Sequence, residues 1–285
     1  MHDHGGGISP VEVGGLVLLV PLAVYLIAAL RSGGRARWPK RRILAWILGC
    51  LVAAVSVHVA TTRHEDFTAH AAAHVGLGML APLLLVLAAP VTLALRSLSA
   101  VPARRLAGVL KSWPVRILAH PVTAGCLSLG GMWLLYAGGL YGSIHTNGIL
   151  FVAVHVHVFA SGCLFTASIA CVDPNPHRSG FAVRAVVLCL VAAGHSILAK
   201  YLYGHPPAGV SSADAETGSL LMYYGGDVVS VALAVVLCAA WYRDVGRRRE
   251  RTRARQRPSG FHTDSLSAEP AWVEEGLRTQ RSSSP

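Results

Sequence analysis

Two histidines, His70 and His74, stand four residues apart in an apolar stretch of the chain. On an α-helix this spacing puts both imidazoles on one face, and such a pair can bind one metal ion. His155 and His157 form a second pair, but residues two apart on a helix point about 200° apart. We therefore expect one of them to join the first pair and the other to contact a neighbouring helix or the lipid headgroups.

His195 and Asp227 are further ionisable residues in apolar segments. Such groups are expensive in a membrane unless they are paired, so each is a candidate for function. Imidazole and carboxylate together form a ligand set for copper, zinc or iron, and Asp227 could ligate directly or orient a ligating imidazole. The predicted metal ligands are His70, His74, His155, His157, His195 and Asp227. The alternative for each histidine is a packing role, with hydrogen bonds between helices.

The composition indicates that lipid is the solvent around these residues. Of the 285 residues 53% are hydrophobic and 14% are charged, against roughly 25% charged in soluble domains. A helix needs about 20 apolar residues to cross a bilayer. Runs of that kind lie near 11–30, 43–60, 69–95, 118–138, 149–171, 181–203 and 219–242. The sequence therefore predicts an all-α polytopic membrane protein, a bundle of about seven transmembrane helices.

The third run is too long for one straight helix and contains Pro82 and Pro90. We expect it to kink or to end in an interfacial segment. Beyond the fifth run, Asp173-Pro174-Asn175-Pro176 predicts a tight structural turn in which Asp173 can cap backbone groups.

The net charge of +11 comes from basic residues between the apolar runs and in the C-terminal tail, a pattern of membrane topology and not of nucleic-acid binding. Basic residues cluster in 31–42, 96–116, 178–184 and from 243 onward, whereas 1–10, 139–148 and 204–218 have none and 61–68 has one. The positive-inside rule places the N-terminus outside and the C-terminus in the cytoplasm of a bacterium. We thus expect an external segment 1–10, a transmembrane domain 11–242 and a disordered basic cytoplasmic tail 243–285. The predicted ligands then lie in the outer half of the plasma membrane.

Several ordered motifs resemble the CtaG family of cytochrome c oxidase assembly factors over roughly residues 11–242. They are Phe67-x-x-His70-x-x-x-His74 followed by APLLLVLAAPVTLALRSL, HVHVFASGCLF (155–165) with DPNP (173–176), the span with His195, and YYGGD ending at Asp227. The resemblance implies a part in building a haem-copper terminal oxidase, by supplying copper from the external side. It also maps the family's histidine and acidic positions onto the six predicted ligands. Ala71, Ala72, Ala73 and Gly76 stand where bulkier apolar residues are expected, which predicts a looser site.

The leading hypothesis is a non-enzymatic metallochaperone of the respiratory chain. It would bind copper reversibly and pass it to a subunit of a haem-copper terminal oxidase, with membrane lipid as its other partner. One alternative is a seven-span zinc hydrolase that uses His70, His74, His195 and Asp227. Others are a membrane electron carrier with haem between two spans and a copper permease. The sequence leaves the oligomeric state open.

Overall fold

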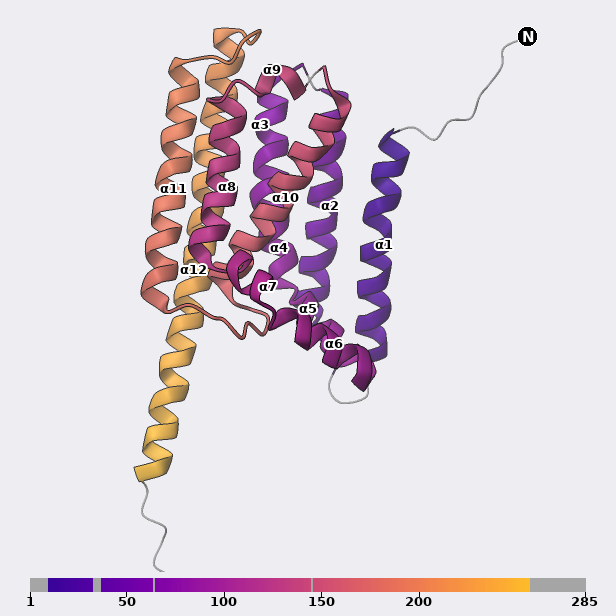
Figure 1. Cartoon of the computed structure of the whole chain (residues 1–285), viewed down its shortest axis with the longest axis vertical. Helices are drawn as coiled ribbons and strands as arrows, with labels where there is room; N and C mark the ends of the chain where they lie inside the picture. Colours follow the sequence, from indigo (N-terminus) through magenta and orange to yellow (C-terminus); the bar gives the residue numbers. More distant parts are fainter. Residues whose placement is uncertain (1–9, 33–36, 64, 145, 257–285) are drawn as a thin grey trace, which may run out of the picture. The chain divides into compact units, whose positions relative to one another are not determined.

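The computed structural model describes residues 10–32, 37–63, 65–144 and 146–256, and all regular structure in these ranges is helical (Figure 1). Most of the predicted external segment 1–10 and the end of the predicted tail, 257–285, lie outside the described residues. One compact unit extends to Ala240, and the chain from Trp241 onward is a separate unit.

The helices follow one another in a simple order. Their bounds are α1 Pro10–Arg31, α2 Lys40–Thr62, α3 Phe67–Val75, the π-helix η2 Gly76–Leu80, α4 Ala81–Leu87, α5 Pro90–Ser97, α6 Ala100–Leu110, α7 Trp113–Leu118, α8 Pro121–Tyr136, α9 Tyr141–Ile144, α10 Gly148–Ala170, α11 Phe181–Gly204 and α12 Ser212–Gln256. Within the described ranges, five helices are long and apolar enough to cross a membrane: α2, the continuous run Phe67–Leu87, α10, α11 and α12. The chain thus has the helices of a multi-pass membrane protein.

The other two predicted spans are less complete. Leu19–Arg31 of α1 is apolar but shorter than a span. The 16 residues of α8 extend about 24 Å at 1.5 Å per residue, which is less than a typical bilayer core of about 30 Å.

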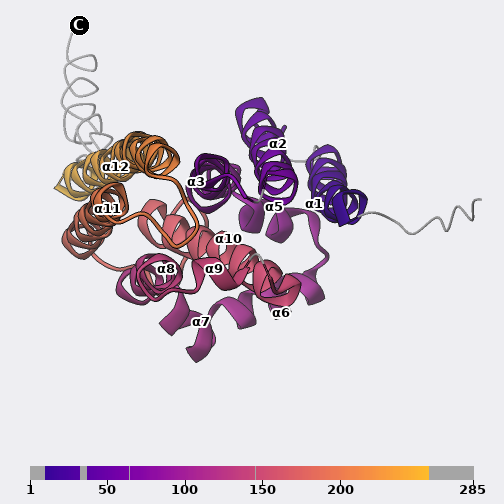
Figure 2. The same ribbon diagram turned by 90° about the horizontal axis from the view of Figure 1, so that it is seen from above.

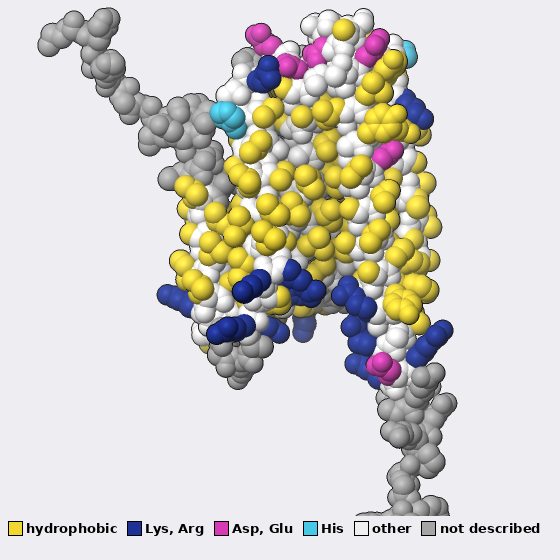
Figure 3. Space-filling model, turned by 180° about the vertical axis from the view of Figure 1, so that it is seen from behind, with side chains coloured by type: hydrophobic (Ala, Val, Ile, Leu, Met, Phe, Trp, Pro, Cys, Tyr) yellow, Lys and Arg dark blue, Asp and Glu magenta, His cyan; other side chains and the backbone are white. Residues whose placement is uncertain are grey.

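The surface of the compact unit is divided into bands (Figure 3). Hydrophobic side chains cover its middle, most Lys and Arg gather at one end and Asp and Glu at the other. Exposed side chains such as Leu190 and Val231 belong to the apolar band. A continuous apolar surface of this kind is typical of contact with lipid or with other proteins, and its charge asymmetry follows the alternation in the sequence.

The run Phe67–Leu87 lies between α2 and α12, with α10 beside it (Figure 2). Pro82 has no N–H to donate to the carbonyl of Gly78, four residues earlier. The helix is π-wound just before this proline, and Ala81 N–H donates to the Gly76 carbonyl five residues back. The Gly78 carbonyl oxygen instead faces Gly162 of α10, where an added Cβ would overlap it. Gly162 therefore lets α10 approach the interrupted helix closely.

A sharp break follows at Ala89, whose φ of 54° is left-handed. The Tyr25 hydroxyl donates to the preceding carbonyl, that of Ala88, over 2.8 Å. The chain then continues as α5, so the long third run ends in a separate short helix, as its prolines predicted.

Carboxylates from distant segments fix the start of α3 and the start of α5. Asp214 accepts hydrogen bonds from the N–H groups of Phe67 and Thr68 at 2.8 and 3.0 Å and from the Thr68 hydroxyl at 2.6 Å. Asp173 accepts in the same way from the N–H and hydroxyl of Thr92 at 2.7 and 2.6 Å, and from Val91 N–H. The predicted capping role of Asp173 is confirmed.

The last helix differs from its prediction. The sequence placed the end of this span at residue 242 and a disordered tail after it, whereas α12 continues through Gln256. The segment after 242 is rich in Arg and Glu, which favour helix, and Arg247 pairs with Asp244 one turn earlier. High charge therefore does not prevent helix formation here.

The contact at Gly162 leads to a stability prediction. Gly162→Ala should lower the free energy of unfolding by about 1 to 3 kcal/mol, because the new methyl group meets a backbone oxygen that cannot move aside easily. Gly130→Ala is the matched control, since nothing lies within 4 Å of its added Cβ and alanine favours helix. Thermal unfolding of the detergent-purified variants measures both. Equal stability of the two variants would contradict the close packing.

Candidate metal centre

Helix α3 places His70 and His74 in the interior, where they are 5% and 7% exposed. Its start is fixed by Asp214 and by Asp66, whose side chain accepts from Ala69 N–H at 2.9 Å. The alanines between the histidines do not loosen the site as expected. Ala71 and Ala73 are 0% and 3% exposed, because their small side chains allow neighbouring elements to pack against the helix.

The two histidines of α3 contact different partners. The rings of His70 and His155 meet edge to face with centroids 6.0 Å apart. The rings of His74 and His195 lie 6.1 Å apart with an angle of 18° between their planes. Four of the predicted ligands therefore form two pairs, which α3 sets about one helical turn apart.

His157 lies away from these pairs, as its spacing from His155 predicted. Its Nε2 donates to the carbonyl of Leu127 over 3.1 Å, and its ring packs against Gly131 of α8. His155 Nδ1 donates to the carbonyl of Phe151 over 2.8 Å. Because a carbonyl can only accept, the proton is on Nδ1 and the Nε2 lone pair of His155 remains available.

The inner pair has nitrogens without hydrogen bonds. His74 Nε2 and both ring nitrogens of His195 are buried and find no hydrogen-bond partner in the described part of the chain. Leaving such a group unsatisfied costs about 1 to 3 kcal/mol. A neutral imidazole has one lone pair and one N–H, so a metal ion that takes one nitrogen from each ring would offset part of that cost.

Asp227 lies beside the inner pair and acts on its helix. Its Oδ1 accepts from the hydroxyl of Ser196, the residue after His195, over 2.9 Å. The preceding residue, Gly226, supports the His195 ring, since an added Cβ would lie 2.7 Å from Nδ1 and closer still to Cε1. The carboxylate and glycine of YYGGD thus position His195 from two sides.

Aromatic side chains surround His70 on the side away from the inner pair. Its ring meets Tyr141 edge to face at 5.2 Å and Tyr136 at 5.9 Å, and both tyrosines also meet Phe67. Burial raises the pKa of the Tyr141 hydroxyl, and Asp214 and Asp66 raise it further, so this phenol stays neutral. No sequence pattern indicated the two tyrosines, because their contact with His70 depends on which helices are neighbours.

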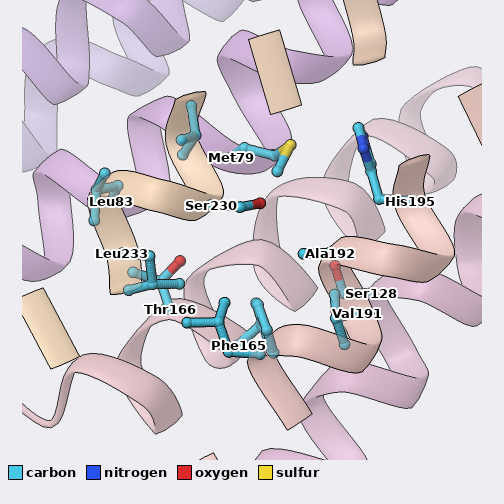
Figure 4. Close-up of a pocket in the computed structure, with 13 residues that line it drawn as sticks. Met79, Leu83, Ser128, Phe165, Thr166, Val191, Ala192, His195, Ser230 and Leu233 are labelled. Atoms are coloured by element: carbon cyan, nitrogen blue, oxygen red, sulfur yellow. The ribbon is translucent and has the colours of Figure 1, made fainter. Parts of the chain in front are cut away.

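His195 also lines a cavity of about 40 Å³ (Figure 4). The rest of its wall is mostly aliphatic and aromatic, with three hydroxyl groups and one thioether. These polar or soft groups belong to Ser128, Thr166, Ser230 and Met79. We call this space the His195 cavity.

The ligand count is low. Across the described ranges, no three side chains of His, Cys, Asp or Glu form a group that could hold a metal ion. The inner pair offers two imidazoles, and Asp227 is bonded to Ser196. Such a set fits an ion that needs few ligands, or one that takes its further ligands from other residue types.

Comparison with known proteins gives one family and several longer relatives. A family model described as cytochrome c oxidase caa3 assembly factor matches residues 23–244. An uncharacterized protein of Mycobacterium leprae is 30% identical over 291 residues, which cover 93% of this chain and 43% of the relative. Proteins of Mycobacterium bovis and Mycobacterium tuberculosis are each 30% identical over 298 residues, 96% of this chain and 44% of theirs. The chain thus spans less than half the length of these relatives. No solved structure matches it.

The packing of Gly226 on His195 generates a prediction about metal binding. For the copper site that the sequence predicts, Gly226→Ala should weaken binding by about 10-fold or more, equivalent to at least about 1.4 kcal/mol, because the methyl group displaces the imidazole of His195. Gly130→Ala should leave binding unchanged. Competition with a chromophoric chelator measures the affinity. Wild-type affinity in Gly226→Ala would mean that His195 is not a ligand.

Proposed function

Because the chain belongs to the family of cytochrome c oxidase caa3 assembly factors, we propose that it is a non-enzymatic assembly factor that binds copper at its buried histidines and passes it to a subunit of a haem-copper terminal oxidase. The observation that carries the copper proposal is the inner pair, His74 and His195, with its three unpartnered ring nitrogens. Two imidazoles that share one ion have ring centres roughly 5 to 6 Å apart, since each metal–nitrogen bond is about 2 Å. The observed 6.1 Å is close to that range.

The surroundings of the pair favour this function over the alternatives. A zinc hydrolase needs three protein ligands, whereas no three side chains of His, Cys, Asp or Glu in the described ranges form a group that could hold a metal ion. A porphyrin needs a pocket of several hundred Å³, and the His195 cavity of about 40 Å³ is far too small.

We further propose a seven-span topology in a bacterial plasma membrane, with the N-terminus outside and the C-terminus in the cytoplasm. Support comes from the gathering of basic residues at one end of the compact unit (Figure 3) and from the mycobacterial relatives. In this orientation α3 enters from outside. His70 and His155 then lie about one helical turn outward of His74 and His195.

Transfer in this scheme is ligand exchange between histidine pairs. Copper leaves His74 and His195, passes His70 and the available Nε2 of His155, and reaches ligands on the oxidase subunit. Phe67, Tyr136 and Tyr141 shield the route from water until the partner docks. Each imidazole must be neutral to bind copper, so its protonation releases the ion.

The copper proposal predicts which histidine variants lose the metal. His74→Ala and His195→Ala should each retain little copper after loading and desalting, whereas His157→Ala should retain as much as wild type because its ring faces α8. Elemental analysis of the detergent-purified proteins measures this. No copper on wild type would leave a scaffold that assists assembly without carrying metal.

The topology has its own test, by thiol labelling of intact cells with a membrane-impermeant maleimide. In a background without the six native cysteines, Ala208→Cys should react and Ala100→Cys should not. Both positions are exposed, and they lie between α11 and α12 and at the start of α6. The opposite pattern would invert the orientation, and reaction at both positions would refute the assignment of opposite sides.

A further inference from the structure

We propose that the thioether of Met79 completes a copper(I) site with the imidazoles of His74 and His195, at the edge of the His195 cavity. The inference rests on the copper binding proposed above and adds a third ligand and an oxidation state. Met79 and His195 both line this cavity. In Figure 4 the Met79 side chain extends toward the side on which His195 lies.

His74 lies next to the cavity, because its ring packs against Gly78 in the cavity wall. An added Cβ on Gly78, which lines the cavity, would lie 3.3 Å from Cε1 of His74. The buried Nε2 of His74 and both buried nitrogens of His195 have no hydrogen-bond partner among the described residues. His195 lines the cavity and His74 packs against Gly78 of its wall, and both rings have buried nitrogens without a partner among the described residues. The thioether-bearing side chain of Met79 lines the same cavity.

The π-helix explains how Met79 comes to this side. Residues five apart on a regular α-helix, such as His74 and Met79, point about 140° apart. The π-helix Gly76–Leu80 contains Met79, and its longer turn reduces that angle. The π-helix just before Pro82 therefore turns the Met79 side chain toward the helix face that carries His74.

The chemistry of this ligand set favours copper(I). Thioether is a soft ligand that selects copper(I), and imidazole binds copper as well. No carboxylate lines the cavity among the described residues, so the cavity itself offers imidazole and thioether ligands, which suit copper(I). The hydroxyls of Ser128, Thr166 and Ser230 can bind water next to the ion, and the cavity has room for it.

The other internal methionines provide matched controls. Met132 and Met222 are 5% and 0% exposed and belong to the core cluster around Phe67, outside the cavity wall. They share the chemistry of Met79 but not its location. Replacement of methionine by leucine changes side-chain volume little and is usually well tolerated.

X-ray absorption of the full-length selenomethionine protein, loaded with copper(I) under ascorbate, tests the proposal. The copper edge should show a selenium neighbour, which cysteine cannot supply. This signal should disappear in Met79→Leu and persist in Met132→Leu and Met222→Leu. Competition with bicinchoninate should give a copper(I) affinity about 10-fold lower for Met79→Leu alone, while zinc binding changes little.

Failure of this inference differs from failure of the proposed function. Bound copper without a selenium neighbour, or a selenium signal that survives Met79→Leu, would overturn the role of Met79. In that case the loss of copper in His74→Ala and His195→Ala would still support the histidine site. Absence of copper from wild type at the elemental analysis would overturn both.

Discussion

Close approach of neighbouring helices to the run Phe67–Leu87 is the constraint on which the interior of this protein depends. Lipid supplies no hydrophobic force that drives helices together, so packing relies on small residues that let backbones meet. Gly162 faces the Gly78 carbonyl, Gly218 faces Phe67, and Gly226 faces the ring of His195. A methyl group at any of these positions would move α10 or α12 away. The contact at Gly162 places α10, which carries His155, beside the central run, and Gly226 of α12 leaves room for the ring of His195 on α11.

A π-helix interrupts this central helix in its middle, and carboxylates fix its start and the start of the helix that follows it. Backbone polar groups inside a membrane must be satisfied or covered by protein, and the π-helix before Pro82 is covered by α10. Asp214 holds the start of this helix and Asp173 the start of α5, which follows it, through nearly identical sets of backbone and threonine hydrogen bonds. These hydrogen bonds hold the chain on both sides of the π-helix Gly76–Leu80, which contains Met79.

Sequence reasoning succeeded where the signal is local. The all-helical class, five membrane-length apolar helices among the described residues, the break of the third run and the family resemblance are confirmed, because hydropathy, prolines and motif order are properties of short segments. The spacing does not indicate which helices are neighbours. His70 and His74 were expected to chelate one ion together, but the ring of His70 meets His155 of α10 and the ring of His74 meets His195 of α11. Tyr136, Tyr141 and Met79 carried no pattern, since their positions depend on helix packing and on a π-helix. The extension of α12 was missed because its composition resembles that of an unfolded tail.

A small ligand set is what delivery of a metal requires. Closed sites with four protein ligands bind zinc so firmly that they stabilise whole folds, and such a site would release copper to a partner poorly. Two imidazoles and one thioether bind more weakly and leave a coordination position for an incoming ligand. Burial then protects the bound ion from water, because His74 and His195 are only 7% and 3% exposed. In the proposed function, selectivity comes from soft ligands and low charge, and release comes from the few bonds that must be exchanged.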